Sequence, residues 1–100
     1  MTLSKLERDL FEAIAKARHM TKERVAKAPG SNLFYFADIQ LDEIERLIKQ
    51  PLAITVDDAR QIKLDLMAVR EFGQEEQDYI NALCLVSYLF KKLINSNEIK

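Results

Sequence analysis

Glycine and proline are scarce in this sequence, and that scarcity limits the folds open to it more than any other feature. Two glycines and two prolines occur among 100 residues. These residue types form most tight turns, because glycine adopts backbone angles that other residues avoid and proline fixes its own φ angle. A β-sandwich or barrel needs many such turns. The sequence therefore favours a few long helices over an all-β fold.

Apolar residues recur at spacings of three and four along most of the chain, which is typical of helices with one buried face. The pattern predicts four helices, over residues 4–28, 33–49, 56–72 and 75–95. Short connections place consecutive helices side by side. We therefore expect an all-α, antiparallel four-helix bundle that forms a single domain over residues 1–100, with a mobile tail at residues 96–100.

Local signals mark several helix ends. Ser4 and Glu7 have the capping-box pattern at the start of the first helix, and Thr55, followed by Val56 and two aspartates, has the pattern of an N-cap for the third. Pro51 ends the second helix, because its ring disfavours helical geometry in the residue before it. Gly73 lies where a left-handed C-terminal cap belongs. These signals separate the third helix from its neighbours on both sides.

Two stretches allow more than one interpretation. The periodicity weakens at His19–Thr21, where the first helix either continues or gives way to a short helix capped by Thr21. The aromatic-rich segment 32–39 is compatible with a helix or with an extended conformation.

The third and fourth predicted helices differ in how much of their surface is apolar. The third carries a single predicted buried stripe, formed by Val56, Ala59, Ile62, Leu66 and Val69. The fourth is apolar on nearly every side over Tyr79–Phe90, so all its faces need cover. That stretch is much shorter than the roughly 20 residues that cross a bilayer. We therefore place the fourth helix at the centre of the bundle or at the seam of a homodimer.

The sequence lacks the residue sets that catalysis or metal binding requires. One histidine and one cysteine cannot form a structural zinc site, and no Glu-x-x-His pair of a di-iron bundle is present. No glycine-rich turn positions a nucleophile. We expect no enzymatic activity, no metal and no cofactor. Cys84 lies in an apolar run, where a buried, reduced thiol fits a cytoplasmic protein, and the N-terminus lacks the pattern of a secretory signal.

Basic residues are concentrated near the N-terminus. Residues 1–28 contain seven basic and four acidic side chains, whereas the whole chain has a formal net charge of -1. A solvated helix face is the usual meaning of such a run. As an alternative, five of these residues are candidates for contacting an anionic partner, either an acidic protein or a nucleic acid. They are Lys16, Arg18, Lys22, Arg24 and Lys27.

Two short motifs resemble those of known families. Ala26 and Gly30 have the spacing found in the turn of helix-turn-helix DNA-binding families, although Pro29 and Ser31 depart from that pattern. This resemblance implies a nucleic-acid-binding regulator that uses the basic first helix and the Pro29-Gly30 turn. His19 and Lys22 are similar to the His-x-x-Lys-Gly motif of histidine phosphotransfer bundles, but a glutamate replaces the glycine. That resemblance implies phosphotransfer through His19.

Aromatic residues supply the main functional hypothesis. Six of them exceed what a bundle of this size readily buries, and aromatic residues are enriched where proteins meet. The chain is therefore predicted to be a non-enzymatic protein-interaction module, such as a regulator, inhibitor, immunity factor or adaptor. A homodimer through the fourth helix is a further expectation. The six candidate interface residues are Phe34, Tyr35, Phe36, Tyr79, Tyr88 and Phe90.

Overall fold

The computed structural model describes residues 5–50 and 54–98 and is helical throughout its regular parts. The elements are α1 (Lys5–Lys27), α2 (Asn32–Lys49), α3 (Val56–Arg60), α4 (Leu64–Glu71), the 3-10 turn η1 (Gln74–Glu76) and α5 (Gln77–Glu98). No strand occurs in the described ranges. The predicted all-α fold is confirmed.

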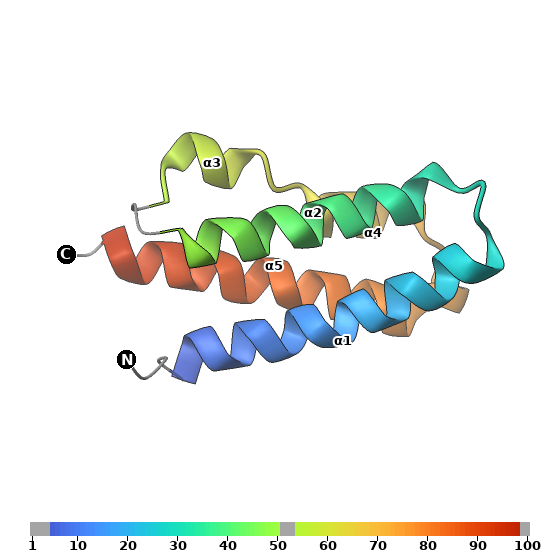
Figure 1. Cartoon of the computed structure of the whole chain (residues 1–100), viewed down its shortest axis with the longest axis horizontal. Helices are drawn as coiled ribbons and strands as arrows, with labels where there is room; N and C mark the ends of the chain where they lie inside the picture. The colour runs from blue at the N-terminus through green and yellow to red at the C-terminus, as the bar shows by residue number, and fades with distance from the viewer. Residues whose placement is uncertain (1–4, 51–53, 99–100) are drawn as a thin grey trace.

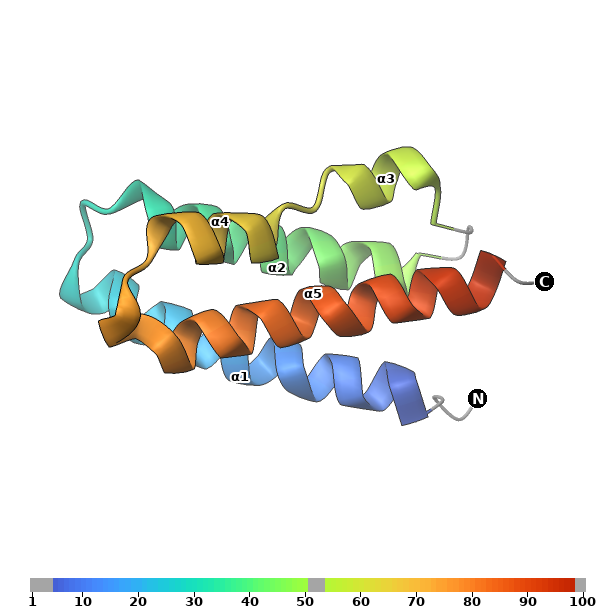
Figure 2. The ribbon, with the colours of Figure 1, turned by 180° about the vertical axis from the view of Figure 1, so that it is seen from behind.

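Four helices form the bundle, and they alternate in direction. In Figure 1, α1 and α2 lie in front and α5 lies behind them, while Figure 2 shows α5 in front, with α4 above it and α1 below it. The α5 helix packs against α1 and α4, and α2 packs against the same two helices from the other side. The one-turn helix α3 joins α2 to α4 at the end of the bundle where α1 begins and α5 ends.

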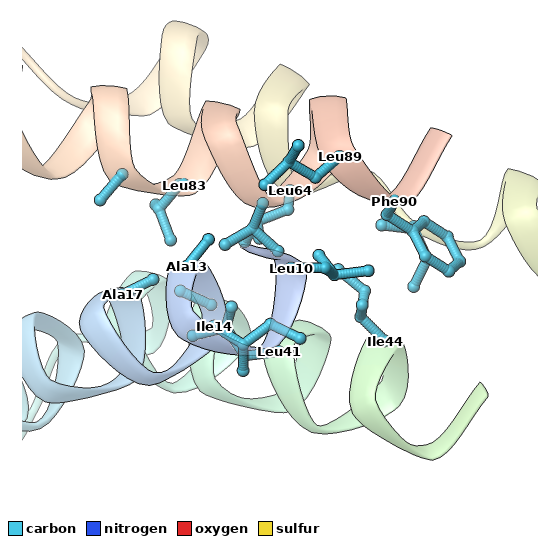
Figure 3. Close-up of a cluster of buried hydrophobic side chains, with 14 of the residues drawn as sticks. Leu10, Ala13, Ile14, Ala17, Leu41, Ile44, Leu64, Leu83, Leu89 and Phe90 are labelled. Carbon is cyan, nitrogen blue, oxygen red and sulfur yellow. The ribbon is translucent and has the colours of Figure 1, made fainter. Parts of the chain in front are cut away.

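Aliphatic side chains from all four long elements meet between the helices (Figure 3). From α1 the core receives Leu10 and Ile14, and these side chains are almost fully buried, as are Leu41 from α2 and Leu64 from α4. Burying such a side chain stabilises a fold by about 1.5–3 kcal/mol, so this core supplies most of the favourable free energy. The α5 helix contributes the largest share: Tyr79, Ile80, Ala82, Leu83, Val86, Leu89, Phe90 and Ile94.

Both open questions in the first half of the chain resolve in favour of helix. The α1 helix runs unbroken through His19–Thr21, and the Thr21 hydroxyl donates to the Ala17 carbonyl one turn earlier instead of capping a new helix. Segment 32–39 is helical, since it lies within α2. Its aromatic residues therefore point to several sides of one helix rather than alternating across a strand.

The predicted third helix is wrong in its middle, because residues 56–72 form two helices instead of one. A break at Gln61–Lys63 separates α3 from α4. The Gln40 side chain from α2 occupies this break, where its Nε2 donates to the Gln61 carbonyl at 3.3 Å and its Oε1 accepts from the Lys63 amide at 2.6 Å. These hydrogen bonds replace those that a continuous helix would have made.

The break also changes which residues are buried. In a continuous helix Ile62, Leu66 and Val69 would share one face. Because α4 starts afresh at Leu64, it buries Leu64 and Ala68 and leaves Leu66 and Val69 exposed at 52% and 64%. The predicted stripe is therefore wrong for its last two members. This change of phase creates exposed apolar surface that the sequence pattern had assigned to the core.

The predicted role of Gly73 is also wrong. Its φ of -89° and ψ of -179° are extended, so it does not form a left-handed cap. The α4 helix ends because Phe72 turns into an extended conformation, with φ -107° and ψ 144°. In that conformation the Phe72 ring stacks on Phe34, with 5.5 Å between the ring centroids. A tertiary aromatic contact accompanies this helix end in place of a glycine cap.

The remaining helix ends follow the prediction more closely. Thr55 forms the predicted cap, and with Asp58 it makes a full capping box. The predicted signals at Ser4 and Pro51 lie outside the described residues. The α5 helix continues to Glu98, beyond the predicted end at residue 95, so only residues 99 and 100 of the expected tail lie outside the description.

Candidate protein-interaction surface

Three of the six predicted interface aromatics lie in the bundle instead of on its surface. Tyr79 and Phe90 are fully buried, and Phe34 is partly buried against the core. Phe34, Phe72 and Tyr79 form a compact cluster in which the Phe72 and Tyr79 centroids are 5.3 Å apart. These aromatic contacts connect α2 and α5 through the end of α4. They stabilise the fold and are not available to a partner.

The other three predicted aromatics are exposed, together with four aliphatic residues, and all seven lie on α2, α4 or α5. None of the exposed large apolar side chains in the described ranges belongs to α1. We define the α2 patch as Tyr35, Phe36 and Ile39. We define the α4–α5 patch as Leu66, Val69, Leu85 and Tyr88.

The α2 patch occupies the first half of α2. Ile39 is 63% exposed, and Tyr35 lies one turn before it on the same side of the helix. Phe36 borders a surface depression of about 640 Å³. The Gln40 side chain, held by its two backbone hydrogen bonds, contributes to the lining. The remaining lining residues are Asp57, Arg60, Gln61 and Lys63.

The α4–α5 patch is held in register by an ion pair between the two helices. Lys91 Nζ lies 2.9 Å from Asp65 Oδ2. Lys92 lies over the Tyr88 ring, with its Nζ 5.7 Å from the centroid.

Two of the five basic candidates are engaged within the molecule. Arg18 pairs with Asp42 at 2.7 Å and with Glu45 at 3.1 Å, so it joins α1 to α2. Arg24 pairs with Glu76. An arginine that pairs with carboxylates within the fold cannot bind a phosphate without losing those contacts. The other three candidates are lysines, spread along α1 at positions 16, 22 and 27.

Arg24 lies at the centre of a polar network where α1 meets the start of α5. Its Nε and Nη2 donate to the two Glu76 carboxylate oxygens at 2.7 and 2.8 Å, and its guanidinium carbon lies 4.3 Å from the Tyr79 ring centroid. The Tyr79 hydroxyl lies 2.7 Å from Thr21 Oγ1. Burial raises the pKa of Tyr79, and the hydrogen bond from Arg24 lowers the pKa of Glu76. Each polar group of the network has a hydrogen-bond partner within the fold, so we interpret the network as structural.

The remaining chemical candidates do not assemble into a reactive site. His19 is exposed, and its Nε2 lies 3.9 Å from Glu23. Cys84 is a free, partly buried thiol whose pKa is raised by burial, which makes it a weak nucleophile at neutral pH. Across the described residues, no group of three or more His, Cys, Asp or Glu side chains has the arrangement of a metal site. Within the same ranges, no helix is long and apolar enough to cross a bilayer.

Comparison with protein families adds what the geometry alone does not specify. Residues 9–92 match the model of the Tsi6 family, and this range contains α2, α3, α4, most of α1 and most of α5. The chain belongs to the Tsi6 family. No curated protein and no solved structure gives a significant match. The Tsi6 family is of the immunity type and is not known for enzymatic activity.

Every residue of the α2 patch and the α4–α5 patch lies inside the range that defines this chain as a Tsi6-family member. Four of the seven were not among the predicted interface residues: Ile39, Leu66, Val69 and Leu85. The periodicity of α2 contains the signal for Ile39, because it falls opposite the stripe of Ala37, Leu41 and Ile44. Leu66 and Val69 carried no such signal, since their exposure depends on the break at Gln61–Lys63.

Proposed function

We propose that this chain is an immunity protein that binds a toxin protein and prevents its action, as the type VI secretion immunity character of its family suggests. The family match over residues 9–92 is the observation that carries the proposal. Neutralisation by binding requires a complementary surface and no reactive group. A cytoplasmic location belongs to the same proposal, because Cys84 is a free thiol.

We assign toxin binding to the α2 patch. Its aromatic and aliphatic side chains lie together on one helix, beside a depression that can receive a side chain of the partner. Such a cluster has the composition of an interface centre, where a few apolar anchors carry most of the binding free energy. Arg60 and Lys63 line the same depression together with Asp57, so two of its three charged side chains are cationic. The matching toxin surface is therefore apolar, with carboxylates at its rim.

Co-expression tests this proposal. Genes adjacent to that of this chain are expressed one at a time in a sensitive bacterium to find any that stop growth, and growth is then measured with and without the chain. We expect the wild-type chain to restore growth and Ile39→Asp to restore much less, because a buried carboxylate without a partner disfavours the complex. Arg60→Glu should weaken protection to a smaller extent.

Val69→Asp is the matched control, since Val69 and Ile39 have nearly equal exposure, at 64% and 63%, but lie on different patches. It should protect as well as the wild-type chain. Failure of the wild-type chain to protect or to bind the purified toxin would refute the proposed function. If Ile39→Asp and Val69→Asp lost protection equally, the assignment of toxin binding to the α2 patch would be wrong.

A further inference from the structure

The outward side of α5 carries five residues at alternating intervals of three and four: Asp78, Asn81, Leu85, Tyr88 and Lys92. We call this set the α5 strip. All five side chains are exposed, Leu85 at 46% and Tyr88 at 58%. This spacing is that of a coiled-coil seam, in which one side of a helix meets another helix along its length. In Figure 2, α5 lies at the front of the bundle, between α4 and α1.

The charges of the α5 strip are arranged symmetrically about Leu85. Asp78 lies seven residues before Leu85, and Lys92 lies seven residues after it. If a second copy is laid antiparallel with Leu85 on the twofold axis, Asp78 faces Lys92 of the partner subunit at both ends. A parallel alignment would place like charges together. Only the same surface on both copies can form a twofold interface, so this complementarity of the strip with itself favours a second copy as its occupant.

The side chains between the charged ends fit the same alignment. Tyr88 lies beside Asn81 of the partner subunit, because the two positions are three and four residues from the axis. The Asn81 Oδ1 atom accepts from Gln77 Nε2 at 2.8 Å, which leaves the amide nitrogen of Asn81 to donate to a tyrosine hydroxyl. Leu85 packs on its own symmetry mate at the centre.

The charged ends of the strip have no competing ion pair within the described residues. Lys92 lies over the Tyr88 ring, whereas Lys91 pairs with Asp65. Asp78 lines a depression together with Lys16 and Met20 but forms no ion pair there. From Asp78 to Lys92 the strip extends about 21 Å along the helix. We propose that the chain forms an antiparallel, twofold homodimer through the α5 strip.

The molar mass in solution tests the dimer. Sedimentation equilibrium of the wild-type chain should give twice the 11.6 kDa of one chain at about 100 μM, where a micromolar dimer is largely associated. Leu85→Asp should give a monomer, because the twofold axis would bring two carboxylates together. By circular dichroism, the Leu85→Asp variant should be as helical as the wild-type chain, since Leu85 is not part of the buried core. A monomeric wild-type chain, or a Leu85→Asp variant that stays dimeric, overturns the proposal.

Charge exchange tests the antiparallel alignment. Asp78→Lys and Lys92→Asp should each weaken association about tenfold or more, and the double variant should recover most of the loss. Tyr35→Asp on the α2 patch is the control and should leave the dimer intact. If the double variant bound itself more weakly than either single variant, the antiparallel alignment would be refuted. The dimer does not depend on the toxin-binding proposal, because the two use different surfaces and different measurements.

Discussion

Arg24 illustrates how a single side chain can change the meaning of a sequence pattern. In the sequence it belongs to a basic run, yet in the fold its planar guanidinium fits the Glu76 carboxylate with two hydrogen bonds. It also donates to the Met20 carbonyl and lies over the Tyr79 ring. Arg24 near the end of α1 thus joins this helix to the turn η1 that precedes α5.

The Arg24–Glu76 pair makes stability depend on pH in a defined direction. The hydrogen bond from Arg24 lowers the pKa of Glu76 in the folded state, while an unfolded glutamate titrates near 4.3. The stabilisation is therefore present above pH ~4.3 and is lost as the pH falls through the lowered folded pKa. We expect Glu76→Gln to lose about 1–2 kcal/mol at pH 7, after allowance for partial exposure of the pair.

Urea unfolding over a series of pH values measures this effect. The difference in unfolding free energy between the wild-type chain and Glu76→Gln should shrink toward low pH. Glu75→Gln, which changes an exposed carboxylate next to Glu76, serves as the control and should change little at any pH. A gap that stays constant down to pH 2 would contradict the assigned role of the pair.

At the scale of elements, the break between α3 and α4 depends on Gln40. Gln40→Leu removes both hydrogen bonds to the Gln61 carbonyl and the Lys63 amide. We expect a loss of about 1–3 kcal/mol in the free energy of unfolding, because polar backbone groups lose their partners in a partly buried place. Hydrogen exchange of the Lys63 amide should become faster. Gln61→Ala keeps the backbone carbonyl and is the control, for which no comparable acceleration is expected.

The same break marks the limit of what the sequence alone could predict. Periodicity identified α1 and α2 because their apolar stripes are local signals, and a long apolar run identified α5. The Thr55 capping box was recognised because it is local too. The division of residues 56–72 was not predictable, since it depends on a side chain more than 20 positions earlier in the chain. The exposure of Leu66 and Val69 follows from that division, so part of the candidate surface was hidden from sequence patterns.

At the scale of the whole molecule, the exposed large apolar side chains of the described residues are divided between two patches, while α1 turns polar groups toward solvent. The α2 patch lies beside the depression lined by Arg60 and Lys63, and the α4–α5 patch shares Leu85 and Tyr88 with the α5 strip. The α2 and α5 helices both pack against α1 and α4, so they occupy opposite corners of the bundle. A bundle of this shape can therefore present one surface to a second copy and another to a different protein at the same time.

This separation predicts that toxin binding and dimerisation can be lost independently. Ile39→Asp should abolish most protection against the toxin but keep the dimer mass, because Ile39 lies on α2, away from the α5 strip. Leu85→Asp should give a monomer that still binds the toxin, with one toxin molecule for each chain. Light scattering of the purified complexes measures both properties together, since a wild-type complex should contain two chains and two toxin molecules. If Leu85→Asp also lost toxin binding while keeping its helicity, the toxin would have to contact α5 or require the dimer, and the two surfaces would act as one.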